Sequence, residues 1–327
     1  MTTTNRYGGK NMNIQEKYGY VRGFDFQPPW GSNGRDIWAR FDEVEYRRLI
    51  QLGKQAFPKM NTIRVWLSFD AWYDDREQCI QNMRKAAQIL AEESLKMIPV
   101  YCNGWHAVPD YGGFSVGILQ LLENGNFEPY PTYVREVAQA FEDLDVVLMH
   151  DLSNEPLNNF MHDPDACPRL YRFLKRLGDT VRSVSDAPVT IGSQGYPVKL
   201  CGCQSDFEFF DPIVDVHSFH PYSVCYCPKE QHKDWLESAL RLAQPFDKPV
   251  IITECCWGAP TDEARGDLVK LELKNFTEAG VGFIAHALTP SPVADLHPLD
   301  GINPGMYMPF MLLDGTIRPH HECFNLF

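Results

Sequence analysis

The chain has 327 residues, of which 44% are hydrophobic and 22% are charged, a balance typical of a globular protein with a sizeable core and not of a disordered chain. Its formal charge of -13 would repel nucleic-acid phosphates and anionic lipid surfaces. The charge therefore argues against a nucleic-acid or membrane partner and favours a neutral or cationic small substrate.

The chain contains no apolar run of about 18 residues, the length that a membrane helix needs. Its first residues, MTTTNRYGGK, lack the layout of a secretory signal. We therefore expect a cytoplasmic protein, or a secreted one if the chain is a mature form. The sequence favours no oligomeric state.

Short apolar runs alternate with amphipathic stretches along the whole chain, which is the pattern of a parallel sheet covered by helices. The strand candidates are residues 20–26, 62–67, 97–102, 146–152, 189–192, 214–219, 250–253 and 282–287. Several of them are apolar at consecutive positions, as expected for strands that are buried on both faces.

Between the strands, apolar residues recur three and four positions apart, as one face of a helix requires. The clearest sets are Ile80, Met83, Ala87 and Leu90; Leu170, Phe173, Leu177 and Val181; and Val269, Leu273 and Phe276. Eight strand and helix units predict an α/β fold, a single-domain (β/α)8 barrel over residues 19–327 that follows an N-terminal extension at 1–18.

An open, doubly wound sheet is the alternative fold, but residues 23–28 read Gly-Phe-Asp-Phe-Gln-Pro and do not form the glycine-rich phosphate loop of that fold. The longest irregular stretches, 103–130 and 288–311, both follow strands. Since barrel enzymes build their sites from such loops, these stretches are candidate walls of a substrate cleft.

Ten cysteines occur, including two Cys-x-Cys pairs and the adjacent Cys255 and Cys256. In a chain of this length we expect mainly reduced thiols, with a set of disulfides as the alternative. Zinc is a third possibility, but the spacing matches structural zinc sites poorly.

Two glutamates, Glu155 and Glu254, follow the fourth and seventh predicted strands. Alone, Asn-Glu-Pro at 154–156 is more typical of a turn or a helix start, and a glutamate after an apolar strand is usually solvated. In a barrel, however, both side chains reach the same face. Retaining cleavage of a glycosidic bond needs two carboxyl groups about 5 to 5.5 Å apart, and this pair is the candidate.

The sequence at 150–156, His-Asp-Leu-Ser-Asn-Glu-Pro, resembles the acid/base motif of clan A glycoside hydrolases, and Pro-Val-Ile-Ile-Thr-Glu at 249–254 resembles their nucleophile motif. Arg-Gly-Phe-Asp at 22–25, Asn-Thr-Ile-Arg at 61–64 and His-Pro-Tyr at 220–222 resemble further elements, closest to family 5 with its cellulases and mannanases. The resemblance implies a retaining β-glycosidase that needs no cofactor or metal.

The resemblance also suggests roles. Glu254 would be the nucleophile, kept ionised by Arg64 and hydrogen-bonded by Tyr222. Glu155 would be the general acid/base, kept protonated before attack by the charge of Glu254. Asn154 would bind the 2-hydroxyl of the sugar.

Four tryptophans lie at or after strand ends, where an aromatic face can stack on a sugar ring: Trp30, Trp66, Trp105 and Trp257. We favour Trp105 and Trp257 because they lie in or beside the catalytic loops.

Histidines mark further candidate positions. His220 and His106 follow the sixth and third strands and are assigned to the site, whereas His217 is expected to pack in the core. His286 lies where the clan commonly has Trp under the cleaved sugar, which leaves the sugar open. His150 replaces a common Trp in the fourth strand and is expected either to face the acid or to pack beneath it.

The expected partner is a carbohydrate with a β-linked gluco-, manno- or galacto-type sugar. A transglycosylase and a catalytically silent carbohydrate-binding barrel are alternatives, although a silent barrel would usually lack one of the two carboxylates. A metal-dependent amidohydrolase would need a His-x-His pair in the first strand, where this chain has Asp25 and no histidine.

Overall fold

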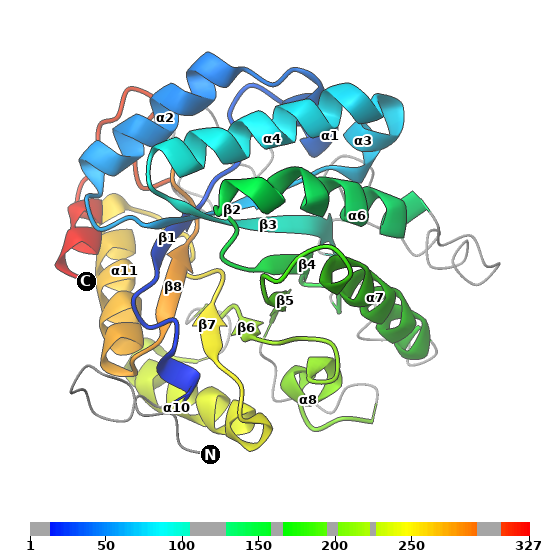
Figure 1. Ribbon diagram of the computed structural model, residues 1–327. Coiled ribbons are helices and arrows are strands. Elements are labelled where there is room, and N and C mark those ends of the chain that lie inside the picture. The colour runs from blue at the N-terminus through cyan, green and yellow to red at the C-terminus, as the bar shows by residue number, and fades with distance from the viewer. Residues whose placement is uncertain (1–13, 105–128, 158–165, 195–201, 223–226, 293–308) are drawn as a thin grey trace, which may run out of the picture.

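Eight parallel strands form a closed barrel in which the strands follow one another in sequence order, as a computed structural model of the chain shows (Figure 1). The structure describes residues 14–104, 129–157, 166–194, 202–222, 227–292 and 309–327. The strands are β1 (Arg22–Asp25), β2 (Thr62–Trp66), β3 (Lys96–Asn103), β4 (His150–Asn154), β5 (Val189–Ser193), β6 (His217–Phe219), β7 (Val250–Ile252) and β8 (Gly282–Ala285). The predicted single-domain (β/α)8 barrel is confirmed.

Helices surround the barrel (Figure 1). They are α1 (Gly34–Ala39), α2 (Glu43–Ala56), α3 (Phe69–Asp74), α4 (Arg76–Glu92), α6 (Pro129–Phe141), α7 (Cys167–Arg182), α8 (Asp206–Phe210), α10 (His232–Ala243) and α11 (Asp262–Glu278), with short 3-10 turns η1 (Ile14–Glu16), η3 (Glu142–Leu144), η4 (Lys229–Gln231), η5 (Gln244–Phe246) and η6 (His321–Leu326). Side chains cap several helix starts; Asp42, for example, accepts a hydrogen bond from the amide of Glu45 at 2.9 Å. No helix of the described residues is long and apolar enough to cross a membrane.

The predicted helix faces are those that pack on the sheet. In α7, Leu170, Phe173, Leu177 and Val181 are all fully buried. In α11, Val269, Leu273 and Phe276 are also fully buried. The hydrophobic periodicity therefore identified the surfaces that attach these helices to the barrel.

β4 and β6 begin three or more residues later than the sequence predicts. β4 begins at His150 and not at 146, because the isolated bridge between Met97 and Val147 is one residue out of register with the pairing of Val100 and Asp151 between β3 and β4. β6 begins at His217 and not at 214, because the amides of Asp215 and Val216 both donate to the carbonyl of Val189. A register shift, or two amides that share one carbonyl, interrupts the regular ladder.

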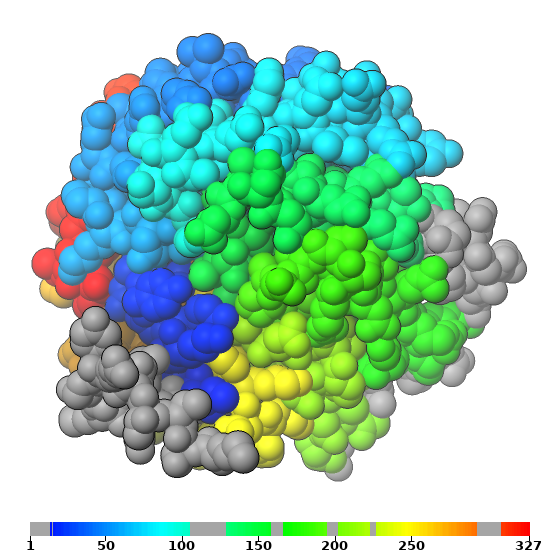
Figure 2. All heavy atoms as spheres, in the orientation of Figure 1, coloured from blue at the N-terminus to red at the C-terminus, as the bar shows by residue number. Residues whose placement is uncertain are grey.

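A small apolar cluster fills the barrel near the starts of its strands. It consists of Tyr18, Val21, Ile98, Met149, Val216, Ile251 and Ile284. Figure 2 shows the neighbouring residues of η1 and the start of β1 in dark blue on the near face of the molecule. The polar side chains described below lie at the other ends of the strands, as expected for a barrel enzyme.

The cysteines are mostly free thiols. Among the described residues, Cys79, Cys102, Cys203, Cys227, Cys255, Cys256 and Cys323 are free, as expected. Cys167 is an exception, because it forms a disulfide bond.

Candidate active site

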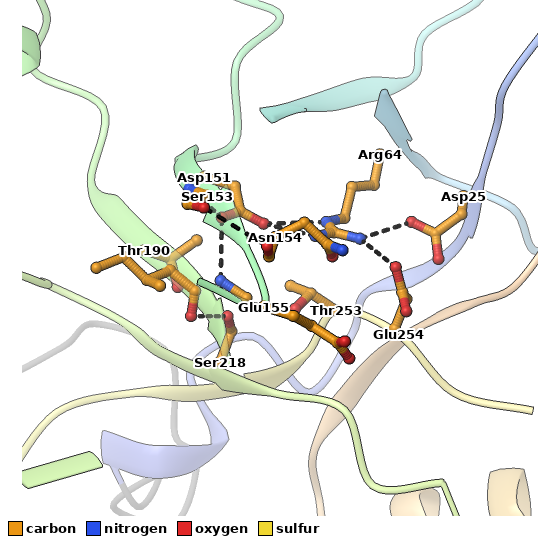
Figure 3. A network of polar contacts seen from close by, with 12 residues as sticks. Asp25, Arg64, Asp151, Ser153, Asn154, Glu155, Thr190, Ser218, Thr253 and Glu254 are labelled. Atoms are coloured by element: carbon orange, nitrogen blue, oxygen red, sulfur yellow. Dashed lines mark hydrogen bonds and ion pairs between the residues drawn. The ribbon is translucent and has the colours of Figure 1, made fainter. Parts of the chain in front are cut away.

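Arg64, in the middle of β2, is the centre of a polar network at the carboxyl ends of the strands. Its guanidinium is fully buried and donates to Glu254 at 2.9 Å, to Asp25 at 3.1 Å and to Asp151 at 2.9 Å. It also donates to the side-chain carbonyl of Asn154 at 2.8 Å. Figure 3 shows the guanidinium between Asp151 on one side and Asp25 and Glu254 on the other. One cation thus orients groups from β1, β4 and the segment after β7.

Two glycines provide the space that this network needs. A Cβ atom at Gly192 in β5 would lie 2.9 Å from Nη2 of Arg64 and 3.0 Å from Nε2 of His220. A Cβ atom at Gly104, after β3, would lie 2.4 Å from the Cα atom of Pro156. The first glycine makes room for the buried guanidinium, and the second lets β3 approach the turn that carries Glu155.

Glu254 is held as a charged carboxylate. Its side chain accepts hydrogen bonds from Arg64 at 2.9 Å and from the hydroxyl of Tyr222 at 2.7 Å. Burial alone would raise the pKa of Glu254, but the charges of His220, His286 and Arg64 and the Tyr222 hydrogen bond outweigh burial and lower it. The predicted contacts of Arg64 and Tyr222 with this glutamate are confirmed.

Glu155 follows the last residue of β4 in a left-handed backbone conformation, with φ of 44°. Residues with side chains rarely adopt this conformation, and it is concentrated at functional sites. The amide of Glu155 donates to the carbonyl of Gly192 at 2.7 Å, which fixes the turn. The side chain is 8% exposed, at the edge of the buried network.

His220 lies between the two glutamates. Its Nδ1 is 2.7 Å from Oε1 of Glu155 and 3.5 Å from Oε2 of Glu254, and its Nε2 is 3.1 Å from the hydroxyl of Thr253. A ring nitrogen of His220 and one carboxylate oxygen from each of Glu155 and Glu254 lie within 4.8 Å of one another. The two predicted carboxylates therefore converge, and His220, which the sequence also assigned to the site, lies between them.

Asn154 is fixed on both sides. Its carbonyl accepts from Arg64, and its amino group donates to Asn103 at 3.1 Å. Since an amino group carries two hydrogens, one is left for a substrate hydroxyl.

Two acidic residues of the network, Asp25 and Asp151, have no role that the sequence predicted. Both are fully buried, and Asp151 also accepts from the amide of Gly192 at 3.0 Å. Burial raises the pKa of Asp25 to about 6, against the opposing charge of Arg64, and burial also raises the pKa of Asp151. The available signal was an acidic residue within a predicted strand of a buried parallel sheet, which demands a buried partner.

His286 follows β8 directly and pairs with Asp25. Its Nδ1 lies 3.2 Å from Oδ2 of Asp25, and its ring meets the edge of Trp66 at a centroid distance of 6.1 Å. A ring nitrogen of His286 and one carboxylate oxygen from each of Asp25 and Glu254 lie within 4.8 Å of one another. The expected change from Trp to His therefore places an imidazole beside Glu254.

His150 and His217 pack away from the glutamates. Nδ1 of His150 lies 2.8 Å from the hydroxyl of Tyr101, and its Nε2 lies 3.0 Å from the hydroxyl of Ser185. Burial lowers the pKa of His150 to about 4. This settles the open choice in favour of packing. His217 packs against Phe207 and Phe246, as expected.

The candidate tryptophans have different surroundings. Trp257 contacts Tyr222 at a centroid distance of 5.0 Å, and the guanidinium of Arg64 lies 4.5 Å from the centroid of the Trp66 ring. Trp30 donates to the carbonyl of Ile37 in α1 at 3.0 Å. Trp105 and His106 lie outside the described residues.

Three groups of side chains in the described residues bring metal-ligand atoms within 4.8 Å of one another: Glu155, His220 and Glu254; Asp25, Glu254 and His286; and Cys255, Cys256 and Glu272. In the first two groups Arg64 already supplies a positive charge to Glu254, and in the second also to Asp25. A cation bound there would face the guanidinium at close range, so these two groups fit a metal poorly.

Solved structures with a similar barrel include glycosidases. An exo-β-1,4-mannosidase from Opitutaceae bacterium strain TAV5 has a TM-score of 0.72 at 17% identity, over 93% of this chain and 58% of that chain. A GH5_18 enzyme from Streptomyces cattleya in complex with GlcNAc has a TM-score of 0.73 at 15% identity, over 94% of this chain and 79% of that chain. The barrel shares its fold with these glycosidases.

A third relative in fold is endo-glycoceramidase II from Rhodococcus sp., with a TM-score of 0.65 at 18% identity, over 93% of this chain and 78% of that chain. The chain thus spans little more than half the length of the mannosidase and most of the length of the other two. No protein-family model matches the sequence, and no curated protein matches it. The expected likeness to family 5 is confirmed at the level of the fold.

Proposed function

We propose that the chain is a retaining β-glycoside hydrolase in which Glu254 is the nucleophile and Glu155 is the general acid/base. The observation that carries the proposal is that one carboxylate oxygen of Glu155 and one of Glu254 lie within 4.8 Å of each other, while Arg64 donates a hydrogen bond to Glu254 at 2.9 Å. Retaining enzymes need two carboxyl groups about 5 to 5.5 Å apart in unlike environments.

In the first step, Glu155 donates its proton to the leaving glycosidic oxygen while Glu254 attacks the anomeric carbon, and a glycosyl ester forms on Glu254. The hydrogen bonds from Arg64 and Tyr222 hold the attacking carboxylate in one orientation. Asn154, fixed by Arg64 and Asn103, is placed to donate to the 2-hydroxyl of the sugar.

In the second step, Glu155 is ionised and takes a proton from water, which attacks the anomeric carbon and releases Glu254 as a carboxylate. Ester formation has removed the charge of Glu254, which favours the ionised form of Glu155. His220, with Nδ1 at 2.7 Å from Glu155, donates a hydrogen bond to that carboxylate when Nδ1 carries the proton.

The substrate class we propose is a β-linked gluco-, manno- or galacto-type sugar in an oligosaccharide or glycoside. The structures that share the fold include a β-1,4-mannosidase and endo-β-1,4-mannanases by name, so β-mannosides are the first class to assay. A panel of aryl β-glycosides with the three configurations measures the preference directly.

Replacement of Glu254 with Gly tests the nucleophile. Turnover of a dinitrophenyl β-glycoside should fall by at least about 10⁴-fold, because the covalent step is lost. Added azide should restore release of the phenol and yield an α-glycosyl azide, since azide attacks from the vacated side. Wild-type turnover in this variant would contradict the assignment.

Replacement of Glu155 with Ala tests the acid. A dinitrophenyl leaving group needs little protonation, so the first step should be nearly unaffected, whereas a methyl or sugar leaving group should lose about 10²- to 10⁴-fold. Azide should here yield a β-glycosyl azide through the glycosyl ester. Equal losses for both leaving groups would count against an acid role of Glu155. A wild-type protein that binds sugars without turnover would indicate a silent barrel.

A further inference from the structure

Helix α11 buries two charged side chains, Arg265 and Glu272, on the side that faces the barrel, and neither is exposed to solvent. They lie seven residues apart, so they share one face of the helix about 10 Å apart along its axis. Charged side chains are rarely buried completely without a specific partner.

Both side chains bind backbone groups just beyond the catalytic strand ends. Arg265 donates to the carbonyl of His286, the residue after β8, at 2.9 Å. Glu272 accepts from the amide of Cys256, two residues after the nucleophile Glu254, at 2.7 Å. Helix α11 therefore contacts the two segments that carry Glu254 and His286.

These two segments are also bonded to each other. The amide of His286 donates to the carbonyl of Cys255 at 3.0 Å. A continuous chain of contacts thus starts and ends on α11; it runs through Arg265, His286, Cys255, Cys256 and Glu272.

Cys256 has a backbone conformation that needs such support. Its φ of 71° is in the left-handed region, which residues with a side chain seldom adopt. The carboxylate of Glu272 fixes the amide of this residue and hence the turn that follows Glu254.

We propose that Arg265 and Glu272 are positioning residues that hold the backbone after β7 and β8, and thereby set the place of Glu254 and His286 in the cleaving site. The proposal rests on the proposed glycosidase function. The apolar residues Val269, Leu273 and Phe276 already attach α11 to the barrel, so attachment of the helix does not by itself require the two charges.

The chain offers a matched control on the same helix. Asn275 is also buried, but its amino group lies 2.8 Å from Nδ1 of His232 in α10 and contacts neither catalytic segment through that bond. A substitution here perturbs α11 without acting on the turn after Glu254.

The main test compares the double variant Arg265→Met/Glu272→Leu with Asn275→Leu, using a dinitrophenyl β-glycoside that the wild type hydrolyses. The double variant removes one positive and one negative charge together, so the net charge of this helix face is unchanged. Since a misplacement of about 1 Å costs about 10²-fold in rate, kcat should fall about 100-fold while KM changes less than about threefold. Asn275→Leu should lower Tm but keep kcat per folded molecule within about twofold of the wild type.

A second pair of variants decides the matter if the double variant does not fold. Glu272→Gln keeps an oxygen at the same reach, whereas Glu272→Asp keeps the charge but is one methylene shorter. Positioning predicts that kcat is closer to the wild type for Gln than for Asp, and the reverse order would overturn the proposal.

The proposal is also overturned if the double variant keeps the wild-type kcat, or if Asn275→Leu loses as much kcat as the double variant. A wild-type protein that hydrolyses no glycoside would instead refute the proposed function, and with it this inference. Turnover by the wild type therefore distinguishes the two failures.

Discussion

Replacement of Tyr222 with Phe removes one hydrogen bond to Glu254, the proposed nucleophile, and leaves the ring that contacts Trp257. The hydroxyl of Tyr222 donates to Oε2 of Glu254 at 2.7 Å, and both residues are buried. The phenol is neutral, so its removal leaves no unpaired charge. This variant therefore isolates the contribution of one donor to the charged state of Glu254.

The expected effect follows from the strength of such a bond. A hydrogen bond to a charged group contributes about 1.5 to 3 kcal/mol, and about 1.4 kcal/mol corresponds to one pKa unit. The bond favours the ionised form, so its loss should raise the pKa of Glu254 by about 1 to 2 units. Arg64 still donates to Glu254 at 2.9 Å, which keeps the shift from being larger.

The assay is the pH dependence of kcat/KM with an aryl β-glycoside. Its acidic limb reports the ionisation of the nucleophile in the free enzyme and should move to higher pH by about 1 to 2 units. A matched control is Tyr133→Phe, which removes a hydroxyl that donates to the carbonyl of Tyr101 at 3.3 Å in the core. An acidic limb that stays in place in Tyr222→Phe, or that moves equally in Tyr133→Phe, would refute the reasoning.

Two further predictions concern stability and pH. The pKa of Asp25 is raised from 3.8 to about 6, so the stabilising contribution of this group is present below pH 4 and is lost as the pH rises through about 6. Asp25→Asn should remove this pH dependence, which is worth about 3 kcal/mol. In urea unfolding at pH 4.5 and pH 7.5, the variant's free energy of unfolding relative to the wild type should be more favourable at pH 7.5. The pKa of His150 is lowered from 6.5 to about 4, so the stability it contributes is present above pH 6.5 and is lost as the pH falls through about 4. His150→Gln should be less sensitive to acid in the same unfolding assay and should keep its kcat/KM; a large loss of activity would show that His150 acts on the site.

The sequence was sufficient for those site residues whose neighbours form a local pattern. Glu155, Glu254 and Tyr222 lie just beyond strand ends and Arg64 lies in the middle of β2, and barrel closure brings these positions together. Helix faces were also predictable, because burial of a whole face imposes a period on the sequence.

Contacts that depend on strand register were not predictable. Asp25 and Arg64 are direct partners in the β1 and β2 pairing, and His286 reaches Asp25 across 261 positions of sequence. No local pattern encodes such a pairing, since it depends on how the first and last strands close the barrel. Likewise, the charged residues Arg265 and Glu272 interrupt the apolar pattern of α11 and would ordinarily be assigned to its solvent face.

The most direct test of the central claim is to trap the glycosyl ester on Glu254. The wild-type protein is incubated with the 2-deoxy-2-fluoro-β-glycosyl fluoride of the configuration that it hydrolyses, and the digested protein is analysed by mass spectrometry. We predict loss of activity together with one fluorosugar on the peptide that contains Glu254, and none on that peptide in Glu254→Gly. A label on a different residue, or hydrolysis whose first product has the inverted α configuration, would contradict the double-displacement mechanism.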